Sequence, residues 1–234
     1  MKTAGIIGGI GPESTIEYYR LIIKTYRSMV TDGSYPFVII NSIDMKRMLD
    51  GIAGGRLDET VEYLSREIER LSTAGAEFVV LASNTPHIVY DELRRRSRVP
   101  LISIVEATCR AALAMGARRA GLFGTKFTTN GGFYQSVFEP AGLEIVVPSS
   151  PDQKYIHDKY MTELVNGIVL EDTRAELIRI AVDIKRKDGI DCLILGGTEL
   201  PLILRDASGI GIPLLDTTAI HVSEIVRSII DETR

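Results

Sequence analysis

The sequence predicts an α/β protein made of two similar halves, each built on a parallel sheet. Short apolar segments alternate with longer segments of helical periodicity along the chain, which is the pattern of a doubly wound sheet. Several strand-like segments are apolar throughout, as parallel strands covered on both faces are. Landmarks of the first half recur at matching intervals in the second half, which indicates an internal duplication.

The first half opens with a strand over 3–7 that runs into the turn Gly8–Pro12 and then into a helix over about 14–30. The residues expected on the apolar face of that helix are Ile16, Tyr19, Leu21, Ile22 and Tyr26. The segment 36–42 is apolar throughout and predicts a strand buried on both faces.

A helix over 58–73 follows, with Asp58 as its expected N-cap and Gly75 just beyond its end. A strand over 77–82 leads into polar residues 83–85, and a further strand begins at Val99.

The second half repeats this order. A strand and turn at 120–125 resemble the first strand and its turn, and a helix over 172–187 ends at Gly189. A strand over 191–195 then leads into residues 196–201, and a last strand follows at 212–215. Ser83 lies eight residues after Gly75, and Gly197 lies eight residues after Gly189. We therefore predict one domain of residues 1–98 plus about 214–234, and a second of residues 99–213.

Composition excludes several classes of protein. A net charge of −4 with mixed positive and negative residues gives no electrostatic footprint for nucleic acid. No apolar run approaches the ~20 residues that span a bilayer, so we expect no membrane partner and a cytoplasmic location. Two cysteines and three histidines form no disulfide framework and no zinc pattern, so no metal site is expected.

Polar or glycine-rich segments follow several predicted strands. In open α/β sheets, ligands bind beyond the carboxyl ends of the strands, so two related halves that face each other would hold a small ligand in the cleft between them. The turn at Gly9 and Ile10 fits a carboxylate better than a dinucleotide, because it does not match G-x-G-x-x-G cleanly. Residues 83–85 could equally cap a helix.

These segments carry a family resemblance. Gly8-Gly9, Asn84-Thr85 with His87, the turn at 122–125, Thr198-Glu199 and Asp216-Thr217-Thr218 together resemble the aspartate/glutamate racemase family over essentially the whole chain. The resemblance implies two Rossmann-like domains related by a pseudo-twofold axis. It also implies cofactor-independent enzymes that act on acidic amino acids or related small carboxylic acids, usually as homodimers.

The sequence departs from that family at two positions. The family pattern has Cys-Asn-Thr and Gly-Cys-Thr-Glu where this chain has Ser83 and Gly197. Serine is a poor acid or base without an activating partner, and glycine has no side chain, so racemisation by two cysteines cannot proceed. Cys109 and Cys192 fall in a helix and a strand, where buried structural roles are expected.

Other residues could supply chemistry. His87 could act as a general base or donate a hydrogen bond near a helix start, and His221 could face the cleft or the solvent. His157 lies in a polar segment and is expected to be exposed. Lys46 or Arg47 could pair with a substrate carboxylate or lie on the surface.

We therefore predict a racemase-family protein that binds a small carboxylic acid or acidic amino acid, needs no cofactor and catalyses a one-sided reaction such as a lyase or isomerase step. A catalytically silent binder or regulator is the alternative, and a nucleotide-binding module is a third. Ser83 is the expected catalytic residue. The expected substrate-binding residues are Gly9, Ile10, Asn84, Thr85, Thr125, Gly197, Thr198 and Glu199.

Overall fold

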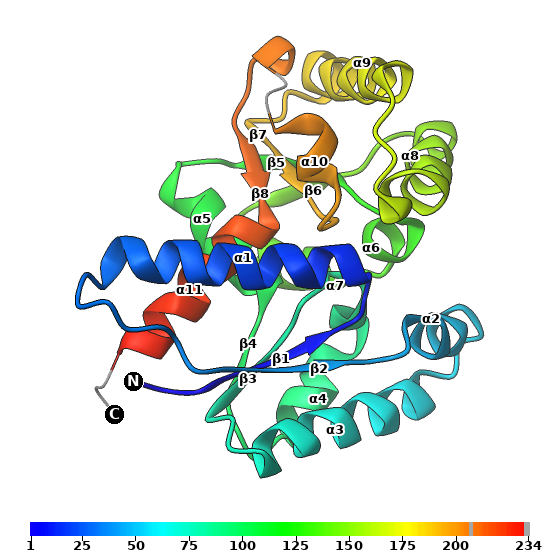
Figure 1. Cartoon of the computed structure of the whole chain (residues 1–234). Coiled ribbons are helices and arrows are strands. Elements are labelled where there is room, and N and C mark those ends of the chain that lie inside the picture. Colours follow the sequence, from blue (N-terminus) through cyan, green and yellow to red (C-terminus); the bar gives the residue numbers. More distant parts are fainter. Residues whose placement is uncertain (206–207, 232–234) are drawn as a thin grey trace. The chain divides into compact units, whose positions relative to one another are not determined.

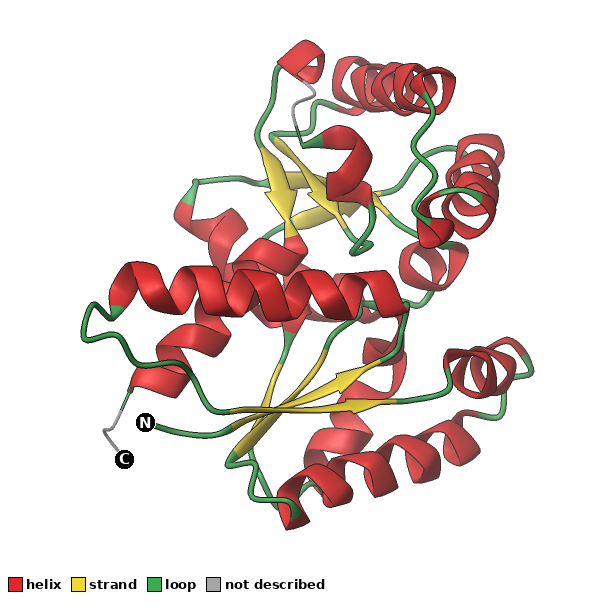
Figure 2. Cartoon of the chain, viewed as in Figure 1, coloured by secondary structure: helices red, strands yellow, loops and turns green. Residues whose placement is uncertain are grey.

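The computed structural model describes residues 1–205 and 208–231. The chain divides into two compact units, residues 1–104 with the described residues from 221 onward, and Val105–Ile220. Each unit contains one four-stranded sheet, and helices alternate with strands in both (Figure 2). The predicted α/β class is confirmed. No helix within the described ranges is long and apolar enough to cross a membrane.

The sheet of the first unit has the order β2-β1-β3-β4, and every neighbouring pair is parallel. Because the strands are parallel, the segments that follow them all emerge at one edge of the sheet. The strands are β1 (Ala4–Gly8), β2 (Val38–Ser42), β3 (Phe78–Leu81) and β4 (Leu101–Ile102).

Two long helices pack on one face of this sheet. Tyr18 and Ile22 of α1 and Val222 and Ile225 of α11 belong to one buried cluster with side chains of β1 and β3. Figure 1 shows both helices beside this sheet. The helices of this unit are α1 (Pro12–Met29), α2 (Met45–Ala53), α3 (Leu57–Thr73), η1 (Thr85–Val89), α4 (Tyr90–Arg96) and α11, which begins just before it (Thr217–Ile230).

Three details of the first unit differ from the sequence-based expectation. β2 is an edge strand of intermediate and exposed residues, so it is not covered on both faces. Ile16 and Tyr19 are 56% and 48% exposed, because the buried face of α1 is formed by Ser14, Tyr18, Ile22 and Tyr26. The N-cap of α3 is Arg56, and Asp58 lies in its first turn.

The second unit repeats the strand order of the first. Its parallel sheet has the order β6-β5-β7-β8, so in both sheets the first strand pairs with the second and third, and the third pairs with the fourth. The strands are β5 (Arg119–Phe123), β6 (Glu144–Val146), β7 (Cys192–Leu195) and β8 (Leu214–Asp216).

One buried cluster joins this sheet to α8 and α9. Tyr160 of α8, Ile180 of α9 and Leu193 of β7 are among its members, and α9 ends at Gly189 with φ of 64°. The helices of this unit are α5 (Ile104–Ala114), α6 (Lys126–Asn130), α7 (Phe133–Phe138), η2 (Glu139–Ala141), α8 (Ser150–Thr162), η3 (Leu164–Asn166), α9 (Glu171–Asp188), α10 (Leu200–Leu204) and η4 (Ser208–Ile210).

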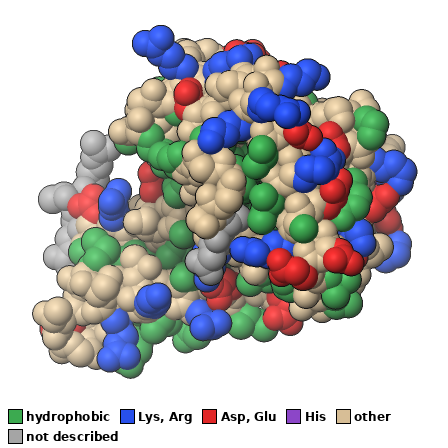
Figure 3. Space-filling view, turned by 90° about the horizontal axis from the view of Figure 1, so that it is seen from above, with side chains coloured by type: hydrophobic (Ala, Val, Ile, Leu, Met, Phe, Trp, Pro, Cys, Tyr) green, Lys and Arg blue, Asp and Glu red, His purple; other side chains and the backbone are tan. Residues whose placement is uncertain are grey.

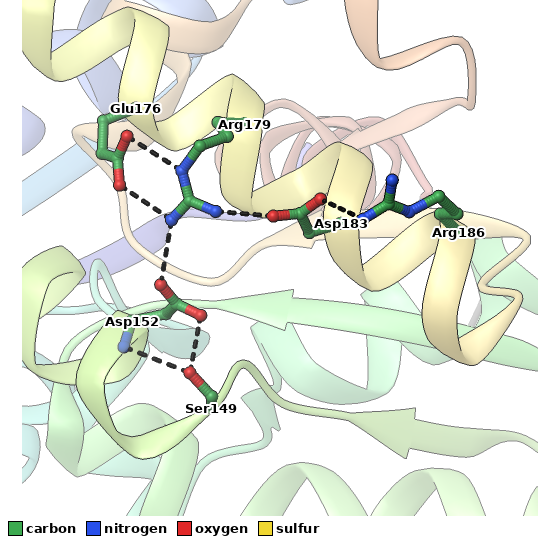
Figure 4. A network of polar contacts seen from close by, with 6 residues as sticks. All are labelled: Ser149, Asp152, Glu176, Arg179, Asp183 and Arg186. Carbon is green, nitrogen blue, oxygen red and sulfur yellow. Dashed lines mark hydrogen bonds and ion pairs between the residues drawn. The ribbon is translucent and has the colours of Figure 1, made fainter.

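A polar network fastens the start of α8 to α9. Arg179 of α9 lies 3.2 Å from Asp152 of α8 and also pairs with Glu176 and Asp183 on its own helix (Figure 4). Asp152 accepts in turn from Ser149, the N-cap of α8. These partly exposed pairs each add little stability, and the pair between Arg179 and Asp152 links the two helices.

Candidate functional site

The predicted site residues lie at the carboxyl edges of the two sheets, where parallel strands bring their following segments together. At the edge of the first sheet, Gly9 and Ile10 follow β1, and Ser83, Asn84 and Thr85 follow β3. At the edge of the second sheet, Thr125 follows β5, and Gly197, Thr198 and Glu199 follow β7.

The turn after β1 is closely packed against its own unit. The N–H of Gly9 donates to Thr15 Oγ1 at 2.8 Å, so that donor is already engaged inside the protein. A Cβ at Gly9 would stand 2.7 Å from the Ile43 backbone nitrogen, and φ of 81° also requires glycine. The close backbone approach that this glycine permits is therefore to the segment after β2.

The segment after β3 is buried. Ser83, Asn84 and Thr85 keep 8%, 2% and 7% of their surface exposed. Asn84 occupies the N-cap of η1, yet its side chain makes no capping hydrogen bond to that short helix. The carbonyl of Asn84 accepts from the N–H of His87 at 3.0 Å. The backbone hydrogen bond of Asn84 thus shapes this turn, and of the capping considered from the sequence, the side-chain cap by Asn84 is not formed.

His87 is buried, and its ring stacks on Tyr90 with centroids 4.9 Å apart. Burial, with the nearby His221 as a second cause, lowers the pKa of His87 to about 3, while hydrogen bonding to the backbone of Asn84 and Ser83 opposes the shift. The imidazole is therefore neutral at physiological pH and too weakly basic to accept a proton readily. This favours the hydrogen-bonding role over the general base.

His221 is fully buried, so it faces no solvent. Its Nε2 lies 3.0 Å from the carbonyl of Ile102, which can only accept, so Nε2 carries the proton. Nδ1 then accepts from the hydroxyl of Tyr18 at 2.9 Å. Both ring nitrogens are used to join α11 to α1 and β4.

Thr125 is the N-cap residue of α6 and is buried. Its carbonyl accepts from the N–H groups of Thr128 and Thr129 at 2.9 and 3.0 Å. Its hydroxyl lies 3.4 Å from that of Thr128, so two hydroxyl groups stand together at this strand end.

The segment after β7 holds a buried carboxylate. Glu199 is 2% exposed, and one of its oxygens, Oε2, accepts from Thr198 Oγ1 at 2.8 Å and from the hydroxyl of Tyr160. Burial raises the pKa of Glu199 despite these hydrogen bonds. The carboxyl group therefore binds a proton more readily than an exposed glutamate does.

Sequence reasoning missed Tyr160, which covers Gly197. A Cβ built on Gly197 would stand 2.9 Å from both Cζ and Oη of Tyr160, and closer still to Cε2. The side of Gly197 that would carry a side chain is thus occupied by the phenol ring. Helical spacing with Ile156 marks Tyr160 as buried, but no sequence signal pairs it with Gly197.

Thr218 follows β8 and is 2% exposed. Among the described residues its Oγ1 finds no hydrogen-bond partner. A buried hydroxyl group without a partner among these residues can form a hydrogen bond with a ligand oxygen.

Neither cysteine is placed for chemistry. Cys109 and Cys192 are free and buried, and burial raises the pKa of Cys192 to about 11. A reactive thiol requires a lowered pKa, so burial acts against both. The expected structural roles are consistent with these environments.

The basic residues after β2 line a surface cavity of about 410 Å³ together with Asp44 and Tyr63. The guanidinium of Arg47 stands 4.3 Å from the Tyr63 ring centroid, and Lys46 pairs with Asp50. Both cations are exposed. His157 is half-buried in α8 instead of exposed in a polar loop.

The described part of the chain contains no group of three or more His, Cys, Asp or Glu residues that could hold a metal ion. On the face drawn in Figure 3, Lys and Arg side chains are interspersed with Asp and Glu side chains.

Repeated parallel sheets with polar residues at their carboxyl edges are typical of α/β proteins that bind small molecules. Comparison with known families and structures makes the assignment specific. Residues 7–225 match the family model described as Asp/Glu/Hydantoin racemase, and the chain belongs to that family. The family resemblance seen in the sequence is thereby confirmed.

Individual relatives agree with this assignment. The broad specificity amino-acid racemase RacX of Bacillus subtilis is 26% identical over 226 residues, which cover 92% of each chain. The crystal structure of an aspartate racemase homologue from Pyrococcus horikoshii has a TM-score of 0.85 and 33% identity, and it covers 99% of this chain and 100% of that one. An aspartate racemase from Picrophilus torridus shares the fold with a TM-score of 0.80 at 21% identity, covering 98% and 94%.

Proposed function

We propose that this chain binds a small carboxylic acid, with acidic amino acids as the first candidates, and catalyses a one-sided reaction on it without a cofactor. The observation that carries the proposal is the segment after β7, where Thr198 and a buried Glu199 stand at a strand end that lacks a thiol. Family membership supports amino acids as the substrate class. The Bacillus subtilis relative is named as a broad specificity racemase, so amino acids with other side chains should also be tested as substrates.

Racemisation by two thiols is excluded by the residues themselves. Position 83 is serine, position 197 is glycine, and the pKa of each remaining cysteine is raised by burial. A proton can still be removed from, or added to, one face of a substrate, and an isomerase or lyase step needs no more acid–base chemistry than this. Two further points stay predictions. One is that a single cleft lies between the carboxyl edges of the two sheets, and the other is that Ser83 is catalytic.

The proposal is tested by incubating the protein in deuterated water with L- and D-aspartate and L- and D-glutamate. We expect loss of the α-proton signal from one enantiomer, with its configuration retained. Asparagine and glutamine, whose side chains are uncharged, serve as controls in the same assay. Exchange accompanied by inversion would contradict the one-sided reaction, and no binding of any of the four acids would contradict the substrate class.

A catalytically silent binder or regulator is the second candidate. This function is favoured because groups of the candidate site already form hydrogen bonds within the protein, as the N–H of Gly9 does with Thr15. Saturable binding of an acidic amino acid without any exchange would select this function. A nucleotide-binding module would instead require stabilisation by nucleotides and none by acidic amino acids.

We also propose that the protein is a homodimer in the cytoplasm. Apolar side chains gather next to the edge strand β2, where Tyr35 and Phe37 are 56% and 60% exposed and Ile40 is 40% exposed. Exposed apolar groups beside a sheet edge are typical of association surfaces.

We expect Phe37→Glu to convert the dimer into a monomer, because a charge would be buried at the association surface. Light scattering after gel filtration measures the change. Leu113→Glu is the control, since Leu113 is 45% exposed on α5 of the other unit. A monomeric wild type, or dissociation by the control variant alone, would contradict this surface.

A further inference from the structure

Tyr160 is rigidly held on α8. Ile156, Tyr160 and Leu164 lie four residues apart and belong to the same buried cluster. The start of α8 is tied to α9 by Arg179 and Asp152 (Figure 4), and just after its end Glu163 accepts from Thr173 Oγ1 at 2.6 Å. The phenol ring therefore has a fixed position and no need to reorder when a ligand binds.

The hydroxyl of Tyr160 lies beside the position at which the family pattern has a cysteine side chain. Its oxygen lies 2.9 Å from the position that a Cβ at residue 197 would take, and a cysteine sulfur would project from that same Cβ. The absence of a side chain at Gly197 is what leaves room for the ring. The phenol thus brings an O–H group to a strand end from which the S–H group is missing.

This hydroxyl is coupled to a carboxylate. Tyr160 donates to Glu199 Oε2, and Thr198 Oγ1 donates to the same oxygen at 2.8 Å. Tyr160 keeps 7% of its surface exposed and Glu199 only 2%, so both members of the pair are buried at this strand end.

The electrostatics of the pair suit proton transfer. Burial, and then the charge of Glu199, raises the pKa of Tyr160 well above its usual value, so the phenol stays protonated. Burial also raises the pKa of Glu199, which increases its affinity for a proton. The environment of each group therefore favours its protonated, neutral form, and a proton can pass between the phenolic oxygen of Tyr160 and the carboxylate of Glu199.

We infer that Tyr160 and Glu199 form a proton relay in place of the second thiol, with Tyr160 as the catalytic residue that contacts the substrate. The inference rests on the proposed function and names the groups that perform its one-sided step. As the phenolic oxygen takes the proton from the α-carbon, the hydroxyl proton of Tyr160 moves to Glu199. The electron pair of the broken C–H bond stays on the substrate, which becomes a carbanion stabilised as its enediolate. Protonated Glu199 exchanges with solvent, and the reverse sequence returns a proton to the same face.

The test measures α-proton exchange of L- and D-aspartate and L- and D-glutamate in deuterated water for the wild type, Tyr160→Phe and Glu199→Gln. Tyr160→Phe keeps the ring against Gly197 and removes only the hydroxyl. We expect exchange to fall at least about 100-fold in either variant, because general acid–base catalysis contributes about 10²–10⁴-fold. Binding of the amino acid, followed by ligand-detected NMR, is expected to be retained in Tyr160→Phe.

The pH profile separates a chemical role from a structural one. Wild-type exchange is expected to rise with pH as Glu199 loses its proton, with a midpoint above the usual glutamate pKa of about 4.3. That limb should be absent in Glu199→Gln, which a purely structural role would not produce. If Tyr160→Phe fails to fold by circular dichroism, Glu199→Gln and its profile decide the matter.

The outcomes distinguish the relay from the proposed function. Exchange at the wild-type rate in Tyr160→Phe overturns the relay and leaves the proposed function standing. Binding without exchange in the wild type overturns the relay and selects the silent binder. Failure of the wild type to bind any of the four acids overturns the relay and the substrate class together.

Discussion

Acidification from pH 7 to pH 5 is expected to lower the free energy of unfolding by about 2 kcal/mol through His87 alone. The pKa of this side chain is about 3 in the folded chain against an ordinary value of 6.5. Between these two values the unfolded chain binds a proton at position 87 and the folded chain does not. The contribution of His87 to the free energy of unfolding is therefore fully present above pH 6.5 and decreases as the pH falls. Once the pH is below 3, the free energy of unfolding is lower by about 5 kcal/mol.

Chemical unfolding with urea at pH 7, 6 and 5 measures this dependence. In His87→Gln, the part of the pH dependence of the unfolding free energy that is due to residue 87 should disappear, because glutamine does not titrate. His157→Gln is the matched control, since His157 is only half-buried and its pKa is less affected. An unchanged slope in His87→Gln would show that His87 is protonated in the folded protein. His221, which contributes to the shift, must stay intact in every variant.

Gly197→Cys is expected to destabilise the protein by about 1–3 kcal/mol, although it restores the residue of the family pattern. The new Cβ would overlap the ring of Tyr160, which is anchored in the core and cannot move away cheaply. Displacing the ring would also break its hydrogen bond to Glu199, which would leave a buried carboxylate short of a donor.

A double-mutant cycle checks this origin. In the background of Tyr160→Ala the same Gly197→Cys change should cost little, because the space is then open, so the coupling energy should exceed about 1 kcal/mol. Gly209→Cys is the control, since among the described residues a Cβ there would meet only Ile178 Cγ2, at 3.9 Å. Urea unfolding under reducing conditions gives all the values. Additive effects of the two substitutions would contradict the steric account.

The fold was predictable because its signals are local and repeated. Apolar strands, glycine turns and helix ends such as Gly189 act within a few residues, and the duplication doubled the evidence. The edge position of β2 was not predictable, since an apolar edge strand has the same composition as a buried one. Helix α2, which begins shortly after β2 ends, was not predicted from the sequence.

The candidate site was predictable only in part for the same reason. The strand ends that carry Asn84 and Thr198 follow from the order of the elements. The partner of Glu199 lies 39 residues away, on a helix whose orientation depends on packing with α9. Which side chain fills the space beside a glycine is a tertiary property, and no spacing rule encodes it.

The contact between Tyr160 and Gly197 also limits the order in which these residues can change during evolution. A ring at position 160 and a side chain at position 197 compete for the same space, so substitutions at the two positions depend on each other. Once tyrosine and glycine are both present, a single substitution of glycine by cysteine meets an occupied space. The contact therefore disfavours the return of a thiol at this strand end unless position 160 changes as well.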